Sequence, residues 1–368
     1  MHDLSGSSFR RALARVVACG VPPMLVLSCS NSPEEAPYPE IGGSPAQLVE
    51  ELRIDGNRED LVPIFAVAVS DGGTIALIQS QDGAIRLFSS AGEPMGSFGR
   101  TGDGPGEFRL PSGIGWQGDT VWVLDLRTPR VTYVARDLSR ARTEGFPQAP
   151  VDEDGGILAV FSPHRRDPPS PYTNFGTLGY LDRRGAIRNV ILPLHEDRTP
   201  GPIRNRTMYA MTPKAGRAAV ASATLNGPGG GTFSLVAVDL AGDTVVARRY
   251  ALEGESIPPS VADSLAEAFP RMRLGDTGRR RASDADIPPV YPPLLGLLVG
   301  YDGSFWVRAR LRDGSRAYLV LAPNGDPVGR VRLPEGSIVG AATLDRIWVL
   351  EPDLFGIQSV VRYRVEWS

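Results

Sequence analysis

Residues 71–98 read DGGTIALIQSQDGAIRLFSSAGEPMGSF. Three short apolar runs follow one another in this stretch, at Ile75–Ile78, Ile85–Phe88 and Met95–Phe98. Glycine-containing turns lie before the first run and between the last two. Such runs between glycine turns are typical of antiparallel strands in a meander. Together with the small-residue run Ala66–Ala68, they predict one unit of four strands.

The same unit recurs along the chain, which indicates a repeat architecture. Counterparts of the second strand lie at Val121–Leu124, Ile157–Val160, Ala218–Ala221, Phe305–Val307 and Ile347–Leu350. First strands favour small residues such as Gly113, Gly115 and Gly296, as expected where inner strands crowd around one axis. Four-stranded meanders repeated about six times predict an all-β fold, a single six-bladed β-propeller. Trp122, Trp306 and Trp348 hold equivalent positions and are predicted to pack between blades.

The ends of the chain predict how the ring closes. The last copy of the unit ends at Val360–Trp367, its third strand, so one strand is missing. A spare strand, Leu48–Ile54, precedes the first copy. We expect these two segments to pair, so that the N-terminal strand completes the last blade and leaves no open edge.

Long insertions follow second strands or link successive units. In a meander, alternate turns lie on opposite faces, so these insertions share one face, called here the elaborated face. They are residues 99–111, 162–174, 193–205, 222–232 and 253–293. Binding sites concentrate on loops held by a rigid scaffold. Within the insertion at about 253–293, a capping-box-like start at Ser260 and apolar residues at Val261, Leu265 and Phe269 predict a helix that caps the mouth.

The N-terminus resembles a bacterial lipoprotein signal. A positive segment with Arg10, Arg11 and Arg15 precedes an apolar stretch, Val16–Ser28, that is shorter than the roughly 20 residues a bilayer requires. The run Leu25–Cys29 resembles a lipobox. We therefore expect a signal peptide at 1–28, lipid on Cys29, a flexible tether over 29–45 and the propeller over 46–368. An ordinary secretory signal is the alternative, and a twin-arginine signal is a weaker one.

This signal predicts a lipid-anchored protein of the bacterial cell envelope. Cys19 lies within the segment that would be removed, so the mature chain would hold one cysteine and no disulfide. A formal net charge of −3 gives no reason to expect nucleic acid as a partner. Contact with the membrane is expected through the lipid anchor alone.

One unit resembles a known repeat family. Residues Gly99–Phe108 read GRTGDGPGEF, and Pro111–Ile114 and Val123–Asp125 follow at the expected places. This pattern is similar to the NHL repeat, and the chain also resembles six-bladed propeller lipoproteins of bacteria. The resemblance implies a fold and a location, but no reaction.

Polar residues that follow second strands are candidates for a binding mouth. They are Asp125, Arg127, Arg308, Arg310 and Glu351. Their other interpretation is structural, as ion pairs between blades and hydrogen bonds at strand ends. The leading functional hypothesis is a non-catalytic binding or scaffolding domain for an envelope protein, peptide or glycan, without a cofactor.

An enzymatic function is the alternative hypothesis. The predicted mature chain has two histidines, His164 and His195, and neither lies near a nucleophile motif. Several six-bladed propellers hold calcium in the central channel, and this resemblance implies a calcium-dependent lactonase or related hydrolase. Weak candidates for oxygen ligands of calcium are Glu107, Asn174, Asn205 and Asn226, with Asp125 and Glu351.

Overall fold

The computed structural model describes residues 38–42, 45–61, 63–125, 127–128, 130–145, 157–161, 177–181, 187–193, 203, 207–212, 216–225, 230–268 and 287–368. The chain divides into two units, Met1–Pro37 and Tyr38–Ser368. All the described residues belong to the second unit. The predicted signal peptide and Cys29 lie outside them.

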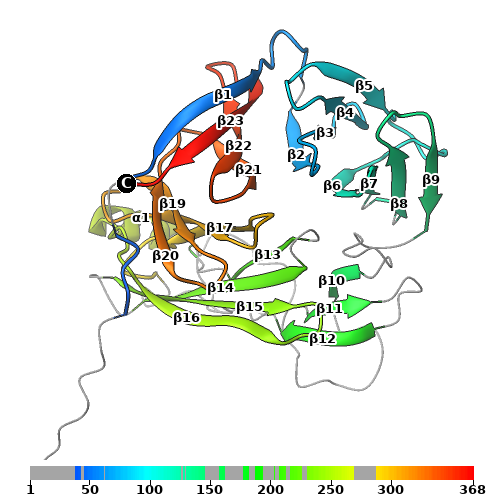
Figure 1. Ribbon diagram of the computed structural model, residues 1–368. Coiled ribbons are helices and arrows are strands. Elements are labelled where there is room, and N and C mark those ends of the chain that lie inside the picture. The colour runs from blue at the N-terminus through cyan, green and yellow to red at the C-terminus, as the bar shows by residue number, and fades with distance from the viewer. Residues whose placement is uncertain are drawn as a thin grey trace, which may run out of the picture. The chain divides into compact units, whose positions relative to one another are not determined.

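Antiparallel sheets make up almost all of the described structure (Figure 1). Three four-stranded sheets come from the first two thirds of the chain. The first contains β2 (Ile64–Val69), β3 (Ile75–Gln79), β4 (Ala84–Phe88) and β5 (Pro94–Phe98). The next contains β6 (Pro111–Gln117), β7 (Thr120–Asp125), β8 (Arg130–Ala135) and β9 (Ala141–Glu144). Another contains β13 (Met208–Thr212), β14 (Arg217–Leu225), β15 (Gly231–Asp239) and β16 (Thr244–Leu252).

The C-terminal third forms two more four-stranded sheets. One contains β17 (Leu294–Val299), β18 (Phe305–Arg310), β19 (Arg316–Leu321) and β20 (Pro327–Val331). The other contains β21 (Ile338–Ala342), β22 (Arg346–Pro352), β23 (Gln358–Glu366) and the N-terminal strand β1 (Gln47–Ile54). A three-stranded sheet, β10 (Ile157–Phe161), β11 (Thr177–Leu181) and β12 (Ile187–Pro193), comes between β9 and β13 in chain order.

These sheets coincide with the predicted repeat units. The second strand of each unit is β3, β7, β10, β14, β18 and β22, as the apolar runs predict. One predicted insertion is wrong, because residues 222–225 and 231–232 belong to the paired strands β14 and β15, with Thr224 opposite Thr232 and Leu225 opposite Gly231. Alternating polar and small residues in that segment hide the strand period.

The predicted closure is confirmed. β1 pairs with β23 in antiparallel register, from Gln47 opposite Glu366 to Ile54 opposite Val360, with an irregularity between Glu50 and Leu52. The last sheet therefore has the order β1–β23–β22–β21 and joins the two ends of the chain, as Figure 1 shows in blue and red.

Neighbouring sheets pack face to face through shared apolar clusters. Buried residues join β2–β5 to β6–β9, β2–β5 to the β1–β23 sheet, that sheet to β17–β20, and β17–β20 to β13–β16. Trp306 is fully buried in the cluster between β17–β20 and the β1–β23 sheet, and Trp348 lies in the next cluster. Both therefore pack between sheets as predicted. This succession of packed meanders is a β-propeller arrangement.

Small residues on first strands make room for two different kinds of neighbour. A Cβ on Gly115 would lie 2.3 Å from the indole of Trp122, its partner on the adjacent strand. A Cβ on Gly340 would instead lie 3.1 Å from Val67 on the first strand of the neighbouring sheet. Crowding between sheets explains Gly340, whereas Gly115 makes room for a tryptophan within its own sheet.

Part of the predicted tether packs against the propeller. The carbonyl of Pro39 accepts a hydrogen bond from the amide of Ala251 on β16, and Ile41 is buried in the cluster of β13–β20. The amide of Ala46 donates to the carbonyl of Arg330. The polar composition of residues 29–45 predicts a flexible segment, but Ile41 within it supplies an apolar contact with the propeller.

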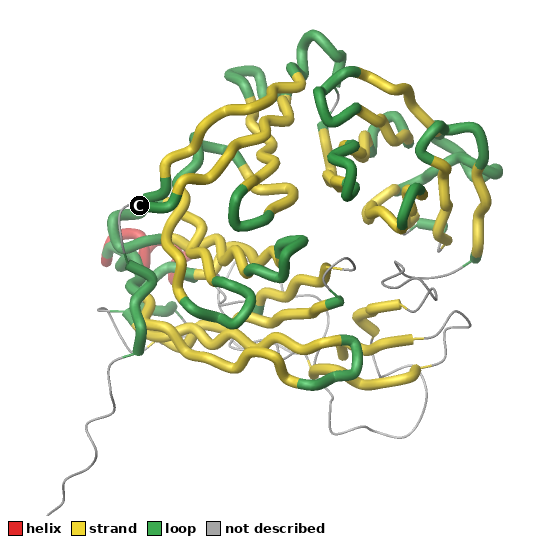
Figure 2. The backbone as a smooth tube through the Cα atoms, viewed as in Figure 1, coloured by secondary structure: helices red, strands yellow, loops and turns green. Residues whose placement is uncertain are grey.

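The predicted helix is confirmed as α1 (Pro259–Ala268), the helix in Figure 2. It begins before Ser260, because the carbonyl of Pro258 accepts the amide of Ala262. Ser260 therefore lies inside the first turn, and its capping-box role is wrong. None of the residues of α1 is buried. In the described part of the chain, no helix has the length and apolar character needed to cross a membrane.

Closure of the ring predicts a clear stability difference within β1. Ile54 is 1% exposed and packs between two sheets, whereas Glu50 is exposed. We expect Ile54→Ala to lower the free energy of unfolding by about 2–4 kcal/mol, measured by denaturant titration. Glu50→Ala is the control and should have a small effect. Equal effects of the two substitutions would contradict a packed closing strand.

Candidate functional site

The elaborated face is the end of the sheets where the long connections lie. β5 joins β6 through residues 99–110, and β16 joins β17 through the segment that contains α1. At the opposite end, β4 joins β5 and β19 joins β20 through five-residue turns, 89–93 and 322–326. The described connections agree with the face predicted for function.

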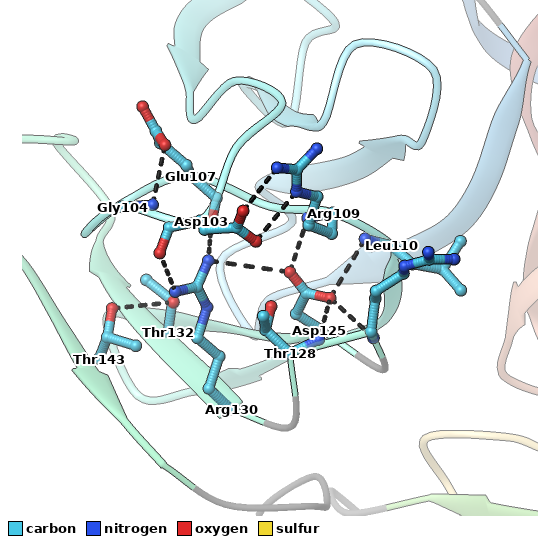
Figure 3. Close-up of polar contacts among 11 residues, drawn as sticks. Asp103, Gly104, Glu107, Arg109, Leu110, Asp125, Thr128, Arg130, Thr132 and Thr143 are labelled. Atoms are coloured by element: carbon cyan, nitrogen blue, oxygen red, sulfur yellow. Dashed lines mark hydrogen bonds and ion pairs between the residues drawn. The ribbon is translucent and has the colours of Figure 1, made fainter.

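Asp125 is the organising residue of the first long connection (Figure 3). Its side chain is fully buried, and its carboxylate accepts hydrogen bonds from the amides of Arg109 (2.7 Å) and Leu110 (3.1 Å). It also accepts from the amides of Arg127 (3.0 Å) and Thr128 (3.3 Å) in the following turn. Asp125 thus ties the 99–110 loop to the β7–β8 turn and lies beneath the surface of the predicted mouth.

Charged side chains also form hydrogen bonds and ion pairs within the 99–110 loop. Glu107 accepts the amide of Gly104 at 2.8 Å and pairs with Arg100 at 2.7 Å. Asp103 pairs with Arg109 at 2.5 Å, and the guanidinium of Arg130 donates to the carbonyls of Asp103 and Glu107. The NHL-like motif therefore encodes a closed, internally bonded loop.

The carboxyl groups of Asp125 and Glu107 are held in the ionised form. Burial alone would raise the pKa of Asp125, but the amides of Arg109, Thr128 and Leu110 outweigh it, and the pKa lies below its ordinary value. The amide of Gly104 and the guanidinium of Arg100 lower the pKa of Glu107. Both groups are carboxylates at neutral pH.

Arg310 fastens the insertion that contains α1. Its guanidinium lies 2.6 Å from a carboxylate oxygen of Glu255 and stacks over the ring of Tyr291, 4.7 Å from the centroid. The amide of Tyr291 donates to the carbonyl of Glu255, so the two ends of the insertion pair with each other. Arg310 holds this stem against the end of β18.

Glu351 joins the closing strand to its sheet. It pairs with Arg53 of β1 at 3.0 Å and accepts the hydroxyl of Tyr363 at 2.7 Å. Burial, followed by the hydrogen bond to Glu351, raises the pKa of Tyr363, so this phenol stays protonated at neutral pH. Glu351 therefore stabilises the pairing of β1 and β23.

No single network of hydrogen bonds and ion pairs among the described residues links the five predicted mouth residues. Hydrogen bonds and ion pairs of the described residues connect Asp125 to the backbone of Arg127, but connect neither to Arg308, Arg310 or Glu351. Arg127 is exposed at the loop surface, and Arg308 is half-buried on β18. The structural roles of Asp125, Arg310 and Glu351 follow the second interpretation given for these residues.

Sequence reasoning missed the turn between β22 and β23. Leu354 is fully exposed and Phe355 is 89% exposed at its tip. Asp353 accepts the amides of Phe355 (2.8 Å) and Ile357 (2.9 Å), and Gly356 has a φ of 84°. The only signal in the sequence is a pair of large apolar residues inside an Asp-x-x-Gly turn.

The calcium candidates divide into two groups. Glu107 and Asp125 are engaged in the loop contacts described above, and Glu351 is paired with Arg53. Asn174, Asn205, Asn226, His164 and His195 lie outside the described residues. No group of three His, Cys, Asp or Glu residues within the described ranges is arranged to hold a metal ion.

Comparison with known proteins supports the fold. The chain matches a protein of Bacteroides fragilis assigned as exported, with 12% identity, a TM-score of 0.53, and coverage of 89% of this chain and 99% of that one. A DUF4221-family protein of Bacteroides vulgatus matches with 12% identity, a TM-score of 0.50, and coverage of 88% and 99%. A gluconolactonase of Xanthomonas campestris has 12% identity, a TM-score of 0.42, and coverage of 89% and 97%.

No protein-family model matches the chain, and no curated protein matches it. The NHL resemblance therefore rests on the motif in residues 99–125 alone. At such low identity, the two Bacteroides structures support the overall fold alone and carry no function to this chain.

The hydrogen bonds that the Asp125 carboxylate accepts predict a pH-dependent loss of stability. We expect Asp125→Asn to lower the free energy of unfolding by about 3 kcal/mol at pH 7, because an amide cannot accept all of these bonds. The pKa of Asp125 is lowered in the folded chain, so its contribution is present above about pH 4 and is lost as the pH falls through the folded pKa.

Denaturant titrations from pH 7 to pH 3 measure this difference between the wild type and Asp125→Asn. Trypsin cleavage within residues 99–110 should also become faster in the variant. Asp103→Asn is the matched control, because Asp103 lies in the same loop but is exposed. A stability difference that stays constant below pH 4 would contradict the assigned role.

Proposed function

We propose that the chain is a lipid-anchored protein of the bacterial cell envelope whose six-bladed propeller binds a partner without catalysis. The sheet β10–β12 supports the sixth blade, because its strands match the second, third and fourth positions of the repeat. Residues 146–156, which precede it, lie outside the described ones. The lipobox resemblance at Leu25–Cys29 supports the anchor.

The observation that carries the proposal is the exposed pair Leu354 and Phe355. Large apolar side chains that project from a fixed turn are typical anchors in protein interfaces, where they lose water on binding. Of the ligand classes expected from the sequence, a protein or peptide fits this pair best, because it can supply an apolar pocket. The turn is preorganised by Asp353, so binding costs little ordering of the backbone.

The position of the turn adds to this argument. Among the described loops and turns, the large exposed apolar side chains are Leu110, Leu354 and Phe355. All three lie on the elaborated face. The turns of the opposite face present none of them, and this asymmetry favours the elaborated face as the docking surface.

Photo-crosslinking tests the proposal directly. With a benzophenone amino acid at Leu354, we expect capture of a defined envelope protein, whereas the same group at Ala91, on the opposite face, should capture none. Adding Phe355→Ser should lower the captured yield at least about tenfold, because an interface anchor contributes about 2 kcal/mol or more. Phe355 is exposed, so thermal unfolding should not change. Equal capture from both faces, or calcium-dependent lactone hydrolysis by the purified protein, would contradict the proposal.

Lipid anchoring makes a separate prediction. Cys29→Ser should move the protein from the membrane fraction to the soluble fraction, because acyl chains supply the membrane affinity. Cys19→Ser is the matched control and should leave the protein in the membrane fraction, since Cys19 belongs to the predicted signal peptide. Fractionation with immunoblotting measures both. A Cys29→Ser chain that still sediments with membranes would be evidence against the anchor.

A further inference from the structure

A pocket of about 340 Å³ lies on the elaborated face beside β18 and β19. Its walls come from these strands, from the β18–β19 turn and from residues 332–337, which lead to β21. It therefore opens where the sheet β17–β20 meets the sheet that closes the ring. No residue of the Leu354–Phe355 turn lines it.

The charged lining of this pocket is mainly positive. Three arginines line it, Arg308, Arg316 and Arg332, against one carboxylate, Glu335. Arg332 lies 3.7 Å from Asp313, which leaves it partly neutralised. Within the described part of the chain, neither Arg308 nor Arg316 forms an ion pair or a side-chain hydrogen bond. Arg308 is half-buried, so its charge is not fully solvated.

Two buried residues that carry hydroxyl groups line the same pocket. Ser337 is 4% exposed, and its Oγ has no hydrogen-bond partner among the described residues. Tyr318 is 6% exposed and accepts the amide of Val339 at 2.9 Å, which leaves its O–H proton available. Burial raises the pKa of Tyr318, so the phenol keeps that proton at neutral pH. Because buried polar groups are normally paired, an acceptor on a bound ligand would satisfy the Ser337 Oγ.

We propose that this pocket binds a small organic anion through a carboxylate or phosphate group. Arg308 and Arg316 supply charge-assisted donors, and the hydroxyls of Ser337 and Tyr318 supply neutral ones. Leu333 and Pro334 line the pocket as well, and they receive an apolar part of the ligand. This set is rich in donors and has one carboxylate, which selects an oxyanion over a cation or a neutral sugar. The site is independent of partner docking at Leu354 and Phe355.

Calorimetric titration of the full-length protein in detergent tests the proposal with three probes. Phenyl phosphate and benzoate carry the two anionic groups on one apolar ring, and benzamide is the neutral analogue of benzoate. We expect saturable binding of at least one anion with a dissociation constant of about 1 mM or tighter, as is usual for ligands of this size. The stronger of the two identifies the preferred group. Benzamide should not bind.

Substitutions assign the binding to this pocket. Arg308→Gln should weaken anion binding about tenfold or more, because a charge-assisted bond from a half-buried guanidinium is lost. Arg58→Gln is the matched control, since Arg58 is exposed on the elaborated face outside the pocket, and it should bind as the wild type does. Ser337→Ala should weaken binding while the unfolding temperature stays the same or rises, because its hydroxyl has no partner in the fold.

Two results would overturn the proposal. One is the absence of saturable binding of both anions by the wild type up to about 10 mM, ten times the expected dissociation constant. The other is anion binding by a folded Arg308→Gln protein that equals the wild type or the Arg58→Gln control. Neither result bears on capture of a partner through Leu354. The anion site and the proposed function are therefore tested independently.

Discussion

The pairing of β1 with β23 is the constraint on which the rest of the structure depends. The sheet β2–β5, the sheet β17–β20 and the sheet that contains β1 each bury apolar residues on both faces, which requires a neighbour on each side. Because the first and last strands share one sheet, the ring has no free edge there. Glu351 and Arg53 reinforce this pairing on its surface, and Ile54 reinforces it in the core.

Apolar packing between sheets holds the strands, whereas the loops depend on contacts of their own. Trp306 and Trp348 belong to clusters that join neighbouring sheets, so the strands hold their positions whatever the connections do. Each connection then needs its own local frame. Asp125 supplies one for residues 99–110, Arg310 supplies one for the insertion with α1, and Asp353 supplies one for the turn at Leu354. These connections are held by hydrogen bonds and ion pairs, and the buried ring of Phe108 adds apolar packing to residues 99–110.

This division explains what the sequence could predict. Apolar runs between glycine turns recur at each blade, so the strands, their order and the closure by Leu48–Ile54 could be read from periodicity. The site could not be predicted in the same way. Arg310 and Glu255 are far apart in sequence, and only the packed fold brings them within 2.6 Å. Asp125 looks like a binding residue because it follows a strand in a loop-rich region, but burial turns its carboxylate toward amides of the backbone.

The same distinction separates polar groups that build the protein from those left for a ligand. The carboxylates of Asp125 and Glu351 are satisfied within the fold, so little of their hydrogen-bonding capacity remains. Arg308 and the Ser337 hydroxyl have no partner among the described residues, although they are partly or wholly removed from water. Burying a polar group without a partner costs free energy, and a stable propeller has no structural need for that cost. The proposed anion would accept hydrogen bonds from these groups and offset part of that cost.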